Sequence, residues 1–242
     1  MGDGTPSAIE ATHCMVVMVT AVNGNWKLPV SYYFVHTLTG LQRAKLLKAV
    51  IHSVNETGVI IMGLTADNPS TNISMFENLG AKLKVDNLKV TLDVLNGLGK
   101  PIYVILDVCH CLKLVRNTFA DKAVLLNGDD QTIRWNLIEE LNKLQQSTGV
   151  HIANKLSNKH LNFQNNKMNV PIATQTLSTS VAKAIEFSFE TLKLQQFKNY
   201  EATSEFIIVF DTVFDILNSF RDHDMNYKEI ISYLLKCLFL RE

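Results

Sequence analysis

The spacing of apolar residues changes near residue 120, and this change most limits the folds open to the chain. Before residue 120, short β-branched runs alternate with segments whose apolar residues recur every three or four positions. After it, the helical spacing continues almost without interruption. Alternating strands and helices indicate a mixed α/β sheet, whereas a long stretch of helical periodicity indicates packed helices. We therefore expect an α/β first half followed by an all-α second half.

The first half begins with a hairpin, because the turn Asn23-Gly24-Asn25 separates two β-branched runs at 14–22 and 26–35. A helix is expected from residue 40 to Gly58, with one apolar stripe made of Leu41, Ala44, Leu47, Ile51 and Val54. The other expected elements are a strand at 59–64, a helix at 70–79, an irregular segment at 82–99, a strand at 101–106 and a helix at 110–119.

The second half shows only helical periodicity, and its expected helices lie at 131–146, 181–192, 206–217 and 230–240. The turn-rich segment Asn127-Gly128-Asp129-Asp130 lies where the periodicity changes. We therefore expect two domains, at residues 1–122 and 123–242.

Composition restricts the class of protein. Hydrophobic residues make up 47% of the 242 residues, enough for a core and outside the range of disordered chains. Lys plus Arg and Asp plus Glu each number 23, so nucleic acid would have to be held by a local basic patch or a partner segment. The longest apolar run, 14–19, is too short to span a membrane. Residues 1–10 show no secretory signal, so we expect four reduced cysteines in an intracellular protein.

Two aspartates follow buried strands directly. Asp67 comes after the strand at 59–64, and Asp107 comes after the strand at 101–106. Open α/β sheets bind ligands at the carboxyl ends of their strands, and a carboxylate there can hold a hard divalent cation. The alternative is that both aspartates lie in loops or cap the helices that follow. Position alone leaves both interpretations open.

One short motif resembles the guanine-reading sequence of small GTPases. Asn154-Lys155-Leu156-Ser157 has serine where that motif has aspartate, and no G-x-x-x-x-G-K-[ST] phosphate loop occurs in the chain. A P-loop fold is therefore excluded, while a helical nucleotide site of another kind stays open. A moderately basic set could form a phosphate-binding face or a solvated surface: Lys113, Arg116, Lys155, Lys159 and Lys167.

Two further groups favour structural interpretations. Cys109-His110-Cys111 has adjacent side chains that point in different directions on a helix, whereas zinc sites use separated pairs. Asp211 and Asp215 lie four residues apart and could bind a metal ion or share a proton. Because Phe210 and Phe214 lie beside them, we expect these acids to border the core and face water.

Long, ordered motifs over nearly the whole chain resemble the P-element transposase family, which includes the THAP-domain transposase-like proteins of animals. The resemblance includes residues 22–30 and Leu64-Thr65-Ala66-Asp67 with the following Asn72. Its strongest motifs are LDVCHCLKLVRN at 106–117, ANKLSNKH at 153–160, KMNVPIATQTLSTSVA at 167–182 and FDTVFDILNS at 210–219.

The resemblance implies an RNase H-like catalytic domain interrupted by a helical GTP-binding insertion. On this basis residues 1–122 correspond to the N-terminal part of the RNase H-like domain without its first strand, and 123–242 to the insertion. The expected fold is an incomplete RNase H-like mixed sheet followed by an all-α domain. An edge left unpaired by the missing strand would cause poor solubility or dimerisation.

The resemblance also implies a catalytic site with three acids and two divalent metal ions, Mg²⁺ in the family. By position Asp67 matches the second acid and is the expected catalytic and metal-binding residue. The first acid would precede this chain and the third would follow it. We therefore expect a truncated or domesticated transposase that does not cleave DNA or transfer strands alone.

GTP in this family assists assembly with transposon DNA. Asp107 and Lys113 match positions that contact the nucleotide, Lys113 through phosphate and Asp107 through a metal ion or a polar contact, and Asn154 and Lys155 are weaker candidates. The implied partners are transposon DNA and a second copy or an intact transposase, and the implied location is the nucleus. Two alternatives remain: a non-catalytic interaction or regulatory protein derived from a transposase, and a metal-dependent nuclease using Asp67 with Asp107.

Overall fold

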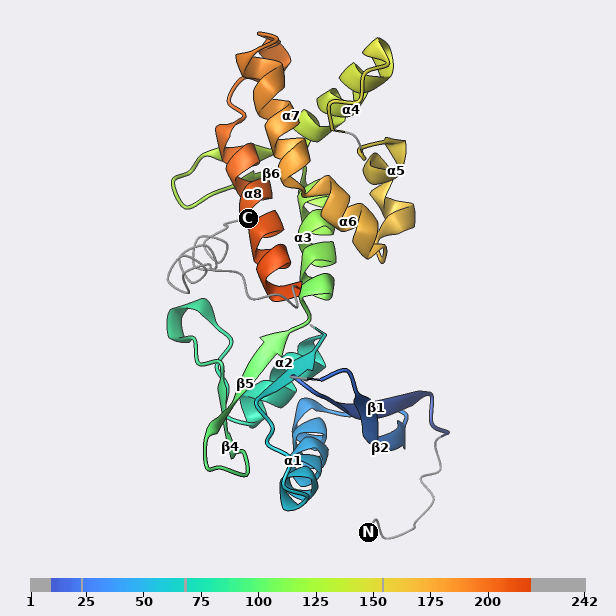
Figure 1. Ribbon diagram of the computed structural model, residues 1–242, viewed down its shortest axis with the longest axis vertical. Helices are drawn as coiled ribbons and strands as arrows, with labels where there is room; N and C mark the ends of the chain where they lie inside the picture. Colours follow the sequence, from blue (N-terminus) through green and yellow to red (C-terminus); the bar gives the residue numbers. More distant parts are fainter. Residues whose placement is uncertain (1–9, 23, 68, 154, 219–242) are drawn as a thin grey trace. The chain divides into compact units, whose positions relative to one another are not determined.

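The computed structural model describes residues 10–22, 24–67, 69–153 and 155–218. The chain forms two compact units, Met1–Asp107 and Val108–Glu242, each with its own apolar core (Figure 1). No helix in this part of the chain is long and apolar enough to cross a membrane.

The first unit contains two small sheets and two α-helices within its described residues (Figure 1). Its elements are β1 (His13–Thr20), β2 (Lys27–Val35), α1 (Gly40–Glu56), β3 (Gly63–Ala66), α2 (Ser70–Asn78), the 3₁₀ turn Val85–Asn87, β4 (Thr91–Leu95) and β5 (Pro101–Leu106). β1 and β2 pair antiparallel, with a bulge between Val17 and Met18. In the second sheet, β5 lies between the parallel strand β3 and the antiparallel strand β4.

Helix α1 begins where the sequence supplies a capping box. The Thr39 hydroxyl accepts a hydrogen bond from the Gln42 amide, and the Gln42 side chain accepts one from the Thr39 amide. This reciprocal pair satisfies two amides that the first turn would otherwise leave unpaired. The expected stripe is confirmed at Ala44, Leu47, Ile51 and Val54, which are buried, but Leu41 is 51% exposed.

Two expectations for the first unit are wrong in detail. The strand expected at 59–64 starts only at Gly63 and pairs with Tyr103–Leu106. The segment expected to be irregular, 82–99, contains β4. Its short alternating pattern becomes a strand because it pairs with β5 and buries Leu92, and neither contact is visible in a local window of sequence.

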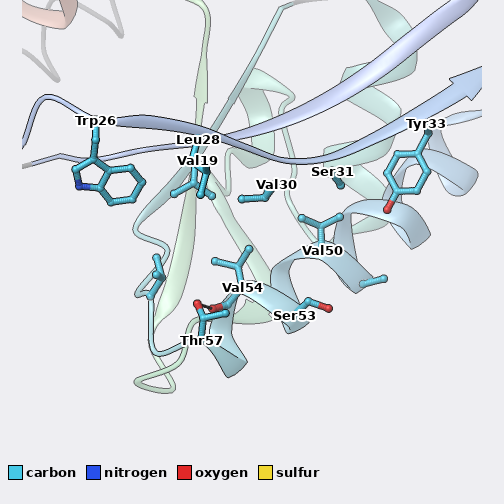
Figure 2. Close-up of a pocket in the computed structure, with 12 residues that line it drawn as sticks. Val19, Trp26, Leu28, Val30, Ser31, Tyr33, Val50, Ser53, Val54 and Thr57 are labelled. Atoms are coloured by element: carbon cyan, nitrogen blue, oxygen red, sulfur yellow. Dashed lines mark hydrogen bonds between the residues drawn. The ribbon is translucent and has the colours of Figure 1, made fainter.

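An apolar cavity of about 390 Å³ lies between the hairpin and α1 (Figure 2). Val19 and Leu28 line it from the hairpin, while Val50 and Val54 line it from α1. The hydroxyl of Ser31 is buried at this cavity and has no hydrogen-bond partner among the described residues. The hairpin therefore covers α1 without filling all the space beneath it.

The second unit is mainly helical (Figure 1). Its elements are α3 (Val108–Lys122), β6 (Val124–Leu126), β7 (Thr132–Arg134), α4 (Asn136–Thr148), α5 (Asn158–Leu161), the 3₁₀ turn Phe163–Asn166, α6 (Val170–Thr176), α7 (Thr179–Glu190), the 3₁₀ turn Gln195–Phe197 and α8 (Glu201–Asn218). Helix α3 packs against α6 and α8, and α7 packs against α8. At the centre of the core, the Phe119 ring lies 5.3 Å from that of Trp135 and 4.9 Å from that of Phe206.

The expectation that the second half is all helical misses one hairpin. β6 and β7 pair antiparallel, and the Asn127 side chain closes their turn by accepting hydrogen bonds from the amides of Asp129 and Gln131. The turn-rich segment is therefore a hairpin turn inside the second unit. Along the sequence, the boundary between the two compact units falls between residues 107 and 108. The domain boundary at 122/123 stays a prediction.

Several helices of the second unit differ from expectation: α8 begins earlier, at Glu201, and the short helices α5 and α6 were not expected. The helix expected at 131–146 begins at Asn136, because Ile133 belongs to β7. The helices expected at 181–192 and 206–217 are confirmed as α7 and α8. The helix expected at 230–240 lies outside the described residues.

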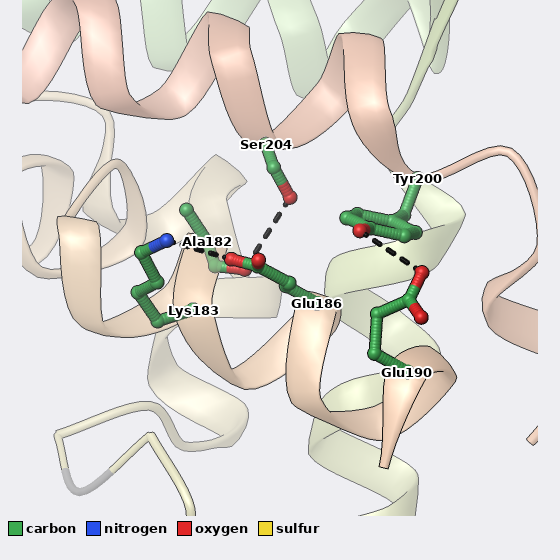
Figure 3. A network of polar contacts seen from close by, with 6 residues as sticks. All are labelled: Ala182, Lys183, Glu186, Glu190, Tyr200 and Ser204. Atoms are coloured by element: carbon green, nitrogen blue, oxygen red, sulfur yellow. Dashed lines mark hydrogen bonds and ion pairs between the residues drawn. The ribbon is translucent and has the colours of Figure 1, made fainter. Parts of the chain in front are cut away.

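Polar contacts hold α8 against α7 (Figure 3). The buried Ser204 hydroxyl donates to the carbonyl oxygen of Ala182 at 3.3 Å, and the Tyr200 hydroxyl donates to Glu190 at 3.3 Å. Desolvation, together with the charge of Glu190, raises the pKa of Tyr200. These contacts tie the start of α8 to both ends of α7.

Candidate functional site

Asp67 and Asp107 lie at the same edge of the second sheet. They follow Ala66 and Leu106, which are paired on the parallel strands β3 and β5, and the Asp107 amide donates to the Ala66 carbonyl at 2.9 Å. Paired strands are about 4.8 Å apart, so the backbones of the two aspartates are neighbours. Asp67 is exposed and Asp107 is partly buried.

The Asp67 carboxylate is held by a side chain from α2. Asn72 Nδ2 donates to Asp67 Oδ1 at 2.6 Å, and Arg43 Nη1 on α1 donates to Asn72 Oδ1 at 2.7 Å. Sequence reasoning placed Asn72 only within a family motif and did not single out Arg43. The signal that could have found Arg43 is weak: a cation on the border of the apolar stripe of α1.

This edge has the donor chemistry of a magnesium site. Mg²⁺ in proteins is commonly bound by one or two carboxylates, with water and phosphate oxygens completing the shell. Asp67 and Asp107 match this requirement in the type of their side chains, and their backbones are neighbours at the ends of β3 and β5. Within the described residues, no group of three or more His, Cys, Asp or Glu side chains is arranged to hold a metal ion.

The candidate lysines of the second unit do not share a cavity. Lys113 lies partly buried on the second turn of α3. Lys155 lines a separate polar cavity of about 320 Å³, together with Gln175, Ser178 and Ser180. Lys113 is not among the residues that line this cavity. The other candidate, Asn154, lies outside the described residues.

Arg116 is not part of a solvated basic face. Its side chain is completely buried, where Nε donates to Asn117 and Nη2 donates to the carbonyl of Asn166 at 2.8 Å. Burial lowers the pKa of Arg116, although the guanidinium group of arginine stays protonated in proteins. Arg116 therefore joins α3 to the segment before α6, whereas Lys159 and Lys167 are exposed.

Asp211 has a structural contact that sequence reasoning missed. Its Oδ2 accepts hydrogen bonds from both the amide and the hydroxyl of Thr179, each at 2.7 Å. Thr179 is the first residue of α7, so the carboxylate of Asp211 caps this helix from α8. The expectation that Asp211 borders the core and only faces water is incomplete for this reason.

Comparisons with known families identify both units. The family model described as "TNP-like, GTP-binding insertion domain" matches residues 109–230, and "TNP-like, RNase H N-terminal domain" matches residues 1–80. The first match starts one residue after the compact second unit begins at Val108.

Two curated relatives are similar over most of the chain. The human DNA transposase THAP9 is 29% identical over 219 residues, which is 90% of this chain and 23% of the relative. The Transposable element P transposase of Drosophila melanogaster is 24% identical over 208 residues, 86% of this chain and 26% of the relative. The chain therefore spans about a quarter of the length of either relative.

A solved structure shows the same fold. The Drosophila P element transposase strand transfer complex superposes with a TM-score of 0.78, at 21% identity, over 93% of this chain and 50% of that chain. This likeness confirms the expected RNase H-like mixed sheet followed by a helical region.

Proposed function

The chain belongs to the TNP-like family of P-element transposases. We propose that its second unit binds GTP and that Asp67 in its first unit binds a divalent cation that contacts DNA. One observation carries the nucleotide part: the GTP-binding insertion model covers 109–230, nearly the whole of a separately packed helical unit. The resemblance of the motif at 106–117 supports Asp107 and Lys113 as nucleotide contacts.

Lys113 and Lys155 are competing candidates for the phosphate contact. A lysine ammonium is a common point-charge partner of phosphate. Lys113 is supported by its place in the family motif. Lys155 is supported by the polar cavity beside it, whose hydroxyl and amide side chains could pair with a ligand. Since they line no common cavity, substitution of each can separate them.

Thermal unfolding of the full chain tests the nucleotide assignment. A ligand at a hundredfold excess over its dissociation constant stabilises by about 2.7 kcal/mol, or roughly 5–10 °C in a domain of this size. We expect this shift with GTP and Mg²⁺, a smaller one with ATP, and loss of the GTP shift in Lys113→Ala. The matched control is Lys159→Ala, which removes an exposed lysine outside both candidate positions.

The outcomes separate the two lysines. A lost GTP shift in Lys155→Ala, with a full shift in Lys113→Ala, would move the site to the polar cavity. No shift with GTP in the unmodified chain would refute the proposed nucleotide function.

We propose Mg²⁺ at the edge formed by Asp67 and Asp107, where it would supply Lewis-acid stabilisation of charge on a phosphate oxygen. The chain's own contribution is to place two aspartates at the ends of the paired strands β3 and β5. A pair of carboxylates is a small share of a two-metal site, so we expect no nicking of plasmid DNA by this chain alone. Mn²⁺-dependent nicking that disappears in Asp67→Ala would instead favour a nuclease.

DNA is the proposed macromolecular partner, since the matching solved structure is a strand transfer complex. The nucleus is the corresponding location. With formal charge zero, the chain should bind DNA weakly at physiological salt, and its affinity should fall as salt rises with a slope set by the number of phosphates it contacts. Fluorescence anisotropy with duplex DNA at salt concentrations from about 50 to 200 mM measures this dependence, because counterion release changes DNA affinity over that range.

A second candidate is an interaction or regulatory role, and the β1–β2 hairpin favours it. Its outer face exposes Val16 at 53%, Tyr32 at 67% and Phe34 at 74%. Contiguous exposed apolar side chains commonly mark protein contacts. Self-association through this face or capture of an intact transposase would support this role, and the nucleotide shift would be absent if it were the only one.

A further inference from the structure

We propose that Arg43 and Asn72 are positioning residues that orient the Asp67 carboxylate for a divalent cation at the edge of the β3–β5 sheet. The proposal rests on the proposed cation-binding role of Asp67. It concerns two residues that touch neither cation nor substrate and act through Asp67.

The chemistry of the three side chains allows only one order of hydrogen bonds. A guanidinium group has donors and no acceptor, and a carboxylate has acceptors and no donor. Asn72 lies between them, so its carbonyl oxygen must face Arg43 and its amide nitrogen must face Asp67. The distances of 2.7 Å and 2.6 Å match this orientation. Arg43 therefore sets which way the Asn72 amide points.

Burial makes this orientation durable. Asn72 is only 8% exposed, and the Nε atom of Arg43 is buried without a partner among the described residues. A flipped amide would place two donors face to face and its oxygen against the carboxylate, and the burial of Asn72 leaves little room for water to repair these contacts. Buried polar chains are costly when partly satisfied, so one arrangement is strongly preferred.

Asn72 also holds the backbone that carries Asp67. Its backbone N–H donates to the carbonyl oxygen of Pro69 at 2.8 Å, and its side-chain Nδ2 lies 3.4 Å from the carbonyl oxygen of Asp67. Asn72 Nδ2 contacts Oδ1 of the carboxylate, which directs the Asp67 side chain back toward α2. The second carboxylate oxygen, Oδ2, is the one that this chain of contacts does not use.

A close approach of α1 to α2 brings Arg43 within reach of Asn72. A Cβ atom on Gly40 would lie 2.3 Å from Ser74 Oγ and 2.8 Å from the Ser74 carbonyl carbon, distances that no side chain tolerates. Gly40 is one turn before Arg43, and Ser74 is two residues after Asn72. The glycine therefore permits the helix contact on which the Arg43–Asn72 hydrogen bond depends.

Titration of the full chain with Mn²⁺ alone, followed by electron paramagnetic resonance of the free ion, tests the proposal. Removing an outer-shell partner of a metal ligand typically weakens metal affinity about 10-fold or more. We expect Asp67→Asn to lose most binding, and Arg43→Met and Asn72→Leu to weaken it about tenfold. Lys45→Met on the exposed side of α1 is the matched control and should bind as the unmodified chain does.

Two readouts separate positioning from a general structural effect. Arg43→Lys retains a cationic donor toward Asn72 and should recover most of the affinity that Arg43→Met loses. Arg43→Met combined with Asn72→Leu should be no weaker than Asn72→Leu alone, because residues that act through one chain are not additive. Circular dichroism must show equal folding for all variants.

The outcomes distinguish this proposal from the cation site itself. If Asp67→Asn leaves Mn²⁺ affinity unchanged, both the cation role and the positioning role fail. If Asp67→Asn weakens binding but folded Arg43→Met and Asn72→Leu do not, only the positioning role fails. If Arg43→Met does not fold, Arg43→Lys is compared with Arg43→Gln, and equal affinities of these two variants overturn the proposal.

Discussion

The two compact units bury their apolar residues to different degrees. In the second unit, helices from distant parts of the sequence share one core, and Phe119, Leu137, Ile138 and Ile207 are completely buried. In the first unit, α1, α2 and the β3–β5–β4 sheet form a smaller core, while the hairpin contributes mainly Val17 to it. The outward face of the hairpin keeps large apolar side chains in water.

The second unit therefore buries its apolar side chains within itself, whereas the first unit leaves apolar side chains of its hairpin exposed. A core shared by several helices gains stability from packing within the chain, whereas a two-stranded hairpin is marginal unless something covers it. We therefore expect core substitutions to act most strongly in the second unit and surface substitutions on the hairpin to act on association.

The largest effect is expected from Phe119→Ala. This ring is completely buried against Trp135 and Phe206, so its removal should cost about 3–5 kcal/mol in the second unit. Differential scanning calorimetry should show one unfolding transition moving strongly and the other staying in place. A single transition that moves as a whole would show that the units do not unfold separately.

Gly40→Ala should destabilise the first unit by about 1–3 kcal/mol, because its Cβ has no space beside Ser74. Urea unfolding measures the loss. Gly97→Ala is the matched control, since its Cβ would meet nothing closer than 3.9 Å. Equal stability of the two variants would contradict the close approach of α1 to α2.

Asp211→Ala should cost about 1 kcal/mol, because the first turn of α7 loses the carboxylate that pairs with Thr179. Urea unfolding of the second unit checks this. Asp211→Asn, which keeps an acceptor oxygen, should recover part of the loss. An unchanged midpoint in both variants would show that water replaces the cap at no cost.

The smallest effect on stability is expected from charges on the hairpin. Tyr32→Lys and Phe34→Lys replace side chains that are mostly in water, so the free energy of unfolding should change by no more than about 0.5 kcal/mol. Sedimentation velocity should nevertheless show less self-association. A chain that is already monomeric at high concentration would refute both the proposed contact face and the dimerisation expected from sequence.

Local patterns were sufficient for the elements that carry a strong periodic signal. The strand at 101–106 and most of the α1 stripe were predicted correctly. Asp67 and Asp107 were selected because each follows a strand, and the structure shows that the two strands they follow are paired. Their roles, like those of Lys113, Asn154 and Lys155, remain proposals.

The missed features all depend on partners distant in sequence. β4 is a strand because β5 lies beside it, and the buried Arg116 donates a hydrogen bond to the carbonyl oxygen of Asn166, fifty residues later in the chain. A basic residue in a helix pattern is equally consistent with a solvated face, so no local rule distinguishes these outcomes.

The order of apolar and turn residues alone established an α/β half, a helical half and the two strand-end aspartates. Only the tertiary structure decided that Arg43, Asn72 and Asp67 form one chain of hydrogen bonds. Periodicity is a property of residues that are close in sequence, whereas these hydrogen bonds join a loop to two helices. They can form because Gly40 lets α1 and α2 approach each other closely.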